Sequence, residues 1–79
     1  MPTIDNIGPY RFFFYSSDGR EPPHVHVQRD SCTAKFWLTP VRLADKPSKF
    51  SKVELRKIRR MIEQNSDNFH GYWINHFVL

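Results

Sequence analysis

Apolar and polar side chains alternate along residues 24–39, a pattern typical of strands that bury one face. Asp30 and Ser31 interrupt the alternation and Pro40 follows it, so we predict a hairpin of strands 24–29 and 32–39. With a two-residue turn, the numbers of paired residues sum to 61. The predicted core face carries Val25, Val27, Ala34, Phe36 and Leu38. The opposite face carries His24, His26, Gln28, Lys35 and Trp37.

A third strand is predicted over residues 11–16, with Phe12 and Phe14 on one face and Phe13 and Tyr15 on the other. Because both faces are apolar, this strand should lie inside the protein or contact another protein. Residues 17–20 read as a turn, and the two prolines at 22–23 hold the chain extended before the hairpin. A short fourth strand is predicted over residues 41–44.

The second half of the chain changes to a helical period. Ser51 and Glu54 form the capping-box pattern, and Phe50 and Leu55 occupy the hydrophobic-staple positions around it. We therefore predict a helix over residues 52–64. Its apolar face consists of Leu55, Ile58 and Ile62.

A second helix is predicted over residues 67–77, where Phe69, Trp73 and Phe77 continue nearly the same register. Residues 65–68 are poor helix formers, and Ser66 can cap a new helix, so we expect a kink or a break there.

This order of elements predicts an α+β fold in a single domain of residues 1–79. We expect a small antiparallel sheet of three to four strands, packed against one kinked helix or two consecutive helices. A chain of this size obtains little stability from one core, so it needs either good packing or an oligomeric partner, such as a second copy.

Positive charge is concentrated in the second half of the chain. The net charge is +4, but residues 42–60 hold eight basic and two acidic side chains, which leaves a negative balance elsewhere. Arg56, Lys57, Arg59 and Arg60 could contact a nucleic-acid backbone, RNA or DNA, or an acidic protein. A solvated helix face without a partner gives the same pattern.

Cys32 is the only cysteine, so no disulfide can form within the chain, which fits a reducing compartment. The first ten residues have no signal-peptide pattern, and the aromatic run at residues 12–15 is too short to span a bilayer. We therefore expect a cytoplasmic protein that does not enter a membrane.

The face with His24, His26, Lys35 and Trp37 is the strongest candidate for a site, because imidazoles, an ammonium and an indole can bind phosphate and stack on a base. Together with Arg56, Arg59 and Arg60, these are the predicted binding residues. As an alternative, His24 and His26 could act as the base and the acid of a metal-independent ribonuclease. In a third interpretation the histidines only hydrogen-bond the proline turn and Trp37 packs beneath a helix.

A metal site is a further alternative, because two histidines at alternate strand positions lie side by side. The spacing supplies two ligands, and the predicted neighbour Lys35 would oppose a cation. His70, His76 or Asp67 could complete the set.

Patterns typical of catalysis are not found. The three glycines are well separated, and the chain has neither a nucleophile elbow nor a phosphate-binding loop. Cys32 has no positioned histidine in the sequence pattern. We assign no catalytic residue, no metal ligand and no cofactor, and the sequence favours a binding protein over an enzyme.

The run Ser16-x-Asp18-x-x-Glu21-Pro-Pro-His-Val-His-Val27, together with Met1-Pro2-Thr3, Arg11-Phe12 and residues 34–38, resembles the bacterial family called domain of unknown function 4160. Glu54-Leu55, Ile58, Phe69, Trp73 and Phe77 resemble its later pattern. The resemblance implies a small protein encoded beside another, in an arrangement like a toxin–antitoxin pair. It therefore implies a cognate protein partner, and it transfers no catalytic residue.

Overall fold

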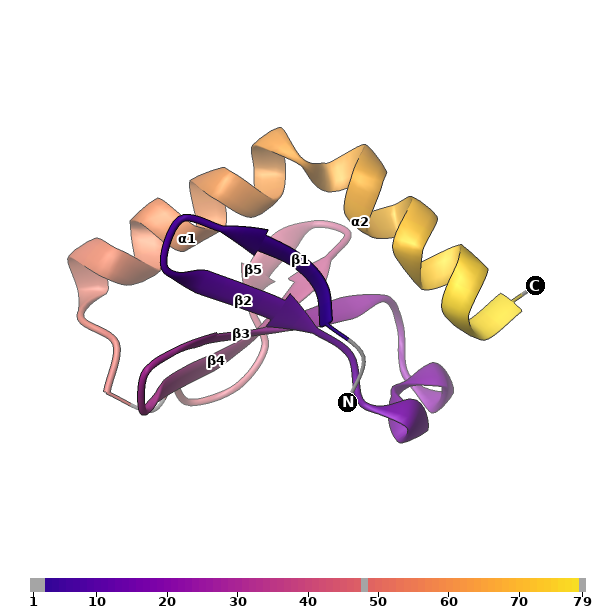
Figure 1. The fold of residues 1–79 in the computed structure, drawn as a ribbon, viewed down its shortest axis with the longest axis horizontal. Helices are drawn as coiled ribbons and strands as arrows, with labels where there is room; N and C mark the ends of the chain where they lie inside the picture. Colours follow the sequence, from indigo (N-terminus) through magenta and orange to yellow (C-terminus); the bar gives the residue numbers. More distant parts are fainter. Residues whose placement is uncertain (1–2, 48, 79) are drawn as a thin grey trace.

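The computed structural model describes residues 3–47 and 49–78, which form a five-stranded sheet with helices packed on one face (Figure 1). The strands follow one another as an antiparallel meander in the order β1-β2-β3-β4-β5. Their bounds are Thr3–Ile7 for β1, Tyr10–Phe13 for β2, His24–Arg29 for β3, Cys32–Leu38 for β4 and Val41–Leu43 for β5. A 3₁₀ helix, η1, joins β2 to β3 over Ser16–Arg20.

The helices come last along the chain and pass over the sheet as an arch (Figure 1). They are α1, Lys52–Gln64, and α2, Ser66–Trp73, which continues as a π-helical turn over Ile74–Val78. The predicted α+β class is confirmed, and the break between two helices falls at Asn65, whose side-chain amide donates to the Met61 carbonyl at 2.8 Å. Among the described residues, no helix is long and apolar enough to cross a membrane.

The sheet has five strands where three to four were predicted. The additional strand is β1, whose residues are exposed or half-buried and so lack the alternation that marks a buried strand. β2 ends at Phe13 instead of residue 16, because the chain then turns into η1 where a simple turn was predicted. Gly8, with a φ of 56°, makes the connection from β1 to β2.

The predicted hairpin register is confirmed. His24 pairs with Trp37, His26 with Lys35, and Arg29 with Cys32, so each pair sums to 61. The predicted core face is buried throughout, and Phe12 and Phe14 lie on the core side of the neighbouring segment. Ile58 and Ile62 of α1 and Phe69 and Trp73 of α2 close the core from above.

The start of α1 differs from the prediction in one respect. Ser51 Oγ accepts the Glu54 amide at 3.2 Å, as expected for the cap. The Glu54 carboxylate does not complete the capping box. It accepts instead from Arg29 at 2.6 and 2.8 Å and from the Tyr10 hydroxyl at 2.7 Å. An ionised guanidinium is a stronger hydrogen-bond donor than the backbone amide of the cap residue. The Glu54 carboxylate therefore joins α1 to β2 and β3 instead of closing the cap.

The predicted cap by Ser66 is wrong. Ser66 is the first residue of α2, so the residue in the capping position is Asn65, which makes no side-chain cap. The Ser66 carbonyl oxygen lies 2.8 Å from Nδ1 of His70, one helical turn later in the chain.

Candidate functional site

Asp18, His24 and His26 meet where η1 folds back toward β3; we call them the Asp-His-His cluster. The two histidines alternate along β3 and so face the same side, with ring centroids 5.2 Å apart. The backbone of Tyr15, at the start of η1, holds Asp18 in place, because Asp18 Oδ2 accepts a hydrogen bond from the Tyr15 amide at 2.8 Å. A strand and a one-turn helix thus place three ligand-type side chains together.

One carboxylate oxygen faces both imidazoles. Asp18 Oδ2 lies 3.0 Å from His26 Nε2 and 3.2 Å from His24 Nε2. The other ring nitrogen of His24, Nδ1, lies 2.9 Å from the Pro22 carbonyl, which can only accept, so Nδ1 carries a proton. His24 is fully buried, and its Nε2 makes no hydrogen bond to another described residue despite the short distance.

The cluster shifts the pKa values of two of its members. Burial disfavours the charged Asp18 carboxylate, but the Tyr15 amide and the two histidines outweigh this effect and lower the pKa of Asp18. Burial also lowers the pKa of His26, against the opposing attraction of Asp18. At neutral pH, therefore, the Asp18 carboxylate is ionised and the His26 imidazole beside it is neutral.

Aromatic rings enclose the histidines. Trp73 of α2 lies 5.1 Å from the His24 ring and Trp37 lies 5.6 Å from it. Tyr15 and Phe13 lie 4.6 and 5.4 Å from the His26 ring. His24 is thus covered, while the His26 side chain stays 17% exposed and gives the cluster its open side.

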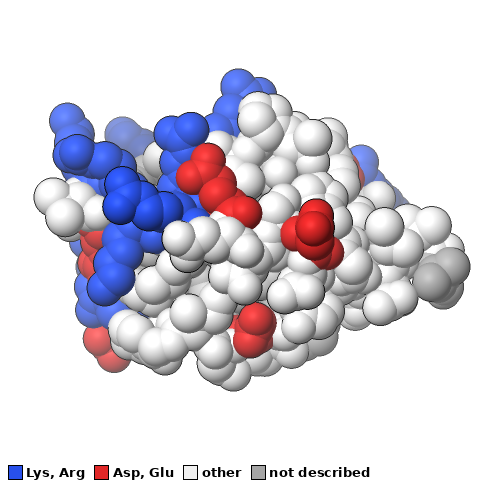
Figure 2. Space-filling view, turned by 90° about the horizontal axis from the view of Figure 1, so that it is seen from above, with Lys and Arg blue, Asp and Glu red and all other residues white. Residues whose placement is uncertain are grey.

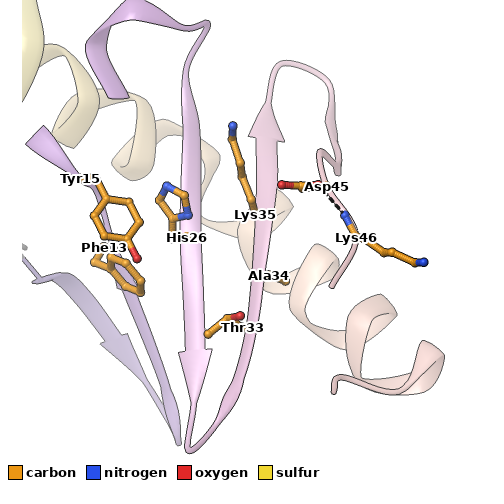
Figure 3. Close-up of a pocket in the computed structure, with 8 residues that line it drawn as sticks. All are labelled: Phe13, Tyr15, His26, Thr33, Ala34, Lys35, Asp45 and Lys46. Atoms are coloured by element: carbon orange, nitrogen blue, oxygen red, sulfur yellow. Dashed lines mark hydrogen bonds between the residues drawn. The ribbon is translucent and has the colours of Figure 1, made fainter. Parts of the chain in front are cut away.

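A shallow hollow of about 170 Å³ adjoins His26 (Figure 3). In this view the His26 ring lies between the two aromatic rings and the Lys35 side chain. The lining residues are Phe13, Tyr15, His26, Thr33, Ala34, Lys35, Asp45 and Lys46.

The cation predicted beside His26 is present but compensated. Lys35 Nζ lies 2.6 Å from Glu21 Oε1 and 4.8 Å from the centre of the Trp37 ring. The confirmed register places His24, His26, Lys35 and Trp37 beside one another, but His24 is fully buried and is not part of an open surface. The positive charge of this face is offset by Glu21 and Asp18, so it is a weaker anion site than the sequence indicated.

The predicted basic residues lie elsewhere. Arg56, Arg59 and Arg60 are exposed on α1, which packs on the core face of the sheet, opposite His26 and Lys35. Lysine and arginine side chains gather at the end of the molecule where α1 begins (Figure 2). The structure thus separates the predicted binding residues into two surfaces.

Asp18 is the member of the site that sequence reasoning missed. Its signals are an acidic side chain in the turn before the histidines and its place in the run that resembles the family, and nothing in the periodicity shows that this turn folds back. The predicted recruits lie apart from the cluster: His70 Nε2 is 2.6 Å from Thr39 Oγ1, and His76 packs on Phe14 and Phe77.

The buried position of His24 also bears on the ribonuclease alternative. A general acid or base must reach the substrate, and His24 has no exposed surface. The geometry favours the alternative in which His24 hydrogen-bonds the proline turn, with Asp18 as an additional neighbour.

The family model for a domain of unknown function, DUF4160, matches residues 10–74, a segment that includes the whole Asp-His-His cluster and α1. No curated protein and no solved structure shows significant similarity to the chain. Since the match covers most of the 79 residues, the chain belongs to the DUF4160 family of domains of unknown function.

Proposed function

We propose that this protein is a small nucleic-acid-binding module that acts with a cognate protein in a pair of the toxin–antitoxin type. The observation that carries the nucleic-acid part is the basic face of α1. It consists of five exposed side chains, Lys52, Arg56, Lys57, Arg59 and Arg60. A backbone of phosphates is the ligand class that such a face attracts.

Two features support a function in binding. The acidic residues of α1 neutralise little of the positive charge on this face. Glu54 forms its ion pair with Arg29 of β3, and Glu63 lies near one basic residue of the face, Arg59, at 3.7 Å. In addition, Val53, Arg56, Lys57 and Arg60 border a shallow hollow of about 290 Å³, so the charges surround a concave surface. Residues four apart on a helix rise about 6 Å, which sets Arg56 and Arg60 in a row along the helix.

The test is a titration of labelled single-stranded RNA, single-stranded DNA and duplex DNA over a series of salt concentrations. Each phosphate contact contributes about 0.9 to the salt slope on duplex DNA and about 0.7 on single strands. The double variant Arg56→Gln/Arg60→Gln should lower the slope by about 1.4 to 1.8 and weaken binding for all sequences.

The matched control is Arg20→Gln/Arg42→Gln, which removes the same charge from exposed positions outside α1. It should leave most of the affinity intact. Equal loss in both variants would mean that net charge and not the α1 face is responsible, and no binding at low salt would exclude the nucleic-acid function.

The protein partner is supported by the family resemblance. Co-expression with the product of the adjacent gene, followed by purification through a tag on one chain, tests it. A stable complex of defined stoichiometry is expected. Light scattering on the protein alone distinguishes this result from a homodimer.

A further inference from the structure

The Asp-His-His cluster brings one carboxylate oxygen and two imidazole nitrogens together, and one of these nitrogens has no hydrogen-bond partner among the described residues. His24 Nδ1 donates to the Pro22 carbonyl, so a neutral His24 has a lone pair on Nε2. That atom is buried, has no hydrogen-bond partner among the described residues, and faces Asp18 Oδ2 at 3.2 Å. A ring nitrogen and a carboxylate oxygen at this distance can share either a proton or a metal ion.

We propose that Asp18, His24 and His26 bind one divalent transition-metal ion of the zinc class, through Asp18 Oδ2 and the two Nε2 atoms. The three atoms lie within 4.8 Å of one another. Ligands held about 2.0–2.2 Å from zinc at tetrahedral angles lie roughly 3.3–3.5 Å apart. The two separations from Asp18 Oδ2, 3.0 and 3.2 Å, are close to this range, and the two Nε2 atoms, which lie within 4.8 Å of each other, would close around the ion.

The surroundings match those of known metal ligands. Metal-binding histidines commonly donate their other ring nitrogen to a carbonyl, as His24 does to Pro22, and metal-binding carboxylates are themselves hydrogen-bonded, as Asp18 is by the Tyr15 amide. The Lys35 ammonium, which would repel a metal ion, is instead bound by Glu21 at 2.6 Å.

The ligand set also indicates the kind of ion. Two imidazoles and one carboxylate favour zinc, nickel, cobalt or ferrous iron over magnesium or calcium, which prefer oxygen ligands. Because zinc is usually four-coordinate, three protein ligands would leave its fourth coordination position free for water or another ligand. With His24 covered by Trp73, that position lies on the His26 side, next to the hollow bordered by Tyr15 and Lys35.

The experiment uses the full chain, treated with chelator and then titrated with Zn²⁺ by calorimetry. One ion per chain and a rise in melting temperature with Zn²⁺ concentration are expected. In the visible spectrum, Co²⁺ should give the absorption of a nitrogen- and oxygen-bound ion. Failure to bind at one equivalent at micromolar concentrations would overturn the proposal.

The variants Asp18→Asn and His26→Gln should each weaken Zn²⁺ binding at least 100-fold, because the first removes the charge of the carboxylate ligand and the second removes an imidazole ligand. The matched control His76→Gln removes an exposed imidazole outside the cluster and should bind as the parent does. Loss of binding in the control, or its persistence in both cluster variants, would locate the ion elsewhere and overturn the assignment.

A measurement on the unmodified protein tests the proposal even if a variant does not fold. Two-dimensional ¹H–¹⁵N spectra of the histidine rings should show Nε2 of His24 and His26 shifting together on addition of Zn²⁺, with His70 and His76 unchanged. If His24 shows both nitrogens protonated and Zn²⁺ shifts neither ring, a proton and not a metal ion bridges the cluster, and the proposal fails.

Discussion

The contact between Phe12 of β2 and Phe69 of α2 should make a measurable contribution to stability. Both side chains are fully buried, and their ring centres lie 5.1 Å apart at 43°. Tilted aromatic pairs contribute about 0.5–1.5 kcal/mol beyond the area they bury. Leucine removes the ring but keeps most of the volume, so Phe12→Leu or Phe69→Leu should each cost about 1–2 kcal/mol.

Leucine is the informative replacement because alanine would cost about 3–5 kcal/mol, as much as the whole stability expected for a domain of this size. The free energy of unfolding can be measured by urea denaturation followed by tryptophan fluorescence. A slope of about 1 kcal/mol per molar urea for a small domain predicts a midpoint lower by about 1–2 M for each variant.

The double variant tests the contact itself. If the rings interact as described, the double variant should lose about 0.5–1.5 kcal/mol less than the sum of the single losses. Phe50→Leu combined with Phe69→Leu is the control, because Phe50 packs on Tyr10 instead, and those losses should add within about 0.5 kcal/mol. Additivity in the Phe12–Phe69 cycle would refute the packing of α2 on β2.

Three further outcomes follow from the structure. Gly8→Ala should destabilise the protein by about 1–2 kcal/mol, because the φ of 56° at this position strains any residue with a Cβ. Gly71→Ala should stabilise it by about 0.5–1 kcal/mol, since Gly71 lies inside α2 and a Cβ there meets no other atom; thermal denaturation distinguishes the two signs. Arg29 and the Tyr10 hydroxyl lower the pKa of Glu54 from 4.5 to about 2. The contribution of the Glu54 carboxylate to the free energy of unfolding is therefore complete above about pH 4.5 and is lost as the pH falls toward 2. Urea midpoints measured from pH 7 to pH 2 should fall over this range in the parent and less steeply in Glu54→Gln; parallel curves would contradict the assignment.

The sequence predicted those parts of the fold that short-range patterns determine. The hairpin register followed from the alternation and a two-residue turn, and the start of α1 followed from Ser51. β1 was missed because its side chains are exposed or half-buried, so no apolar alternation marks it. It is held as a strand by its pairing with β2, which the sequence pattern does not show. Glu54 was assigned to a local cap, whereas its partner Arg29 lies 25 residues away in sequence.

The candidate site was predictable to the same extent. Alternation placed His24 and His26 on one face and the register placed Lys35 beside them. The approach of Asp18 depends on η1 folding back, and the burial of His24 depends on Trp73 of α2, both of which are tertiary contacts. Sequence spacing therefore identified two members of the cluster and could not identify the third.

The meander has a consequence for the order of events in folding. Each strand pairs only with its neighbours in sequence, so the sheet closes short loops, and such contacts form quickly. Residues 18–26, which hold the whole Asp-His-His cluster, belong to this local part of the chain. Trp73 reaches His24 only when α2 docks. The cluster can thus assemble while still open to solvent, and the docking of the last helix is the step that covers it.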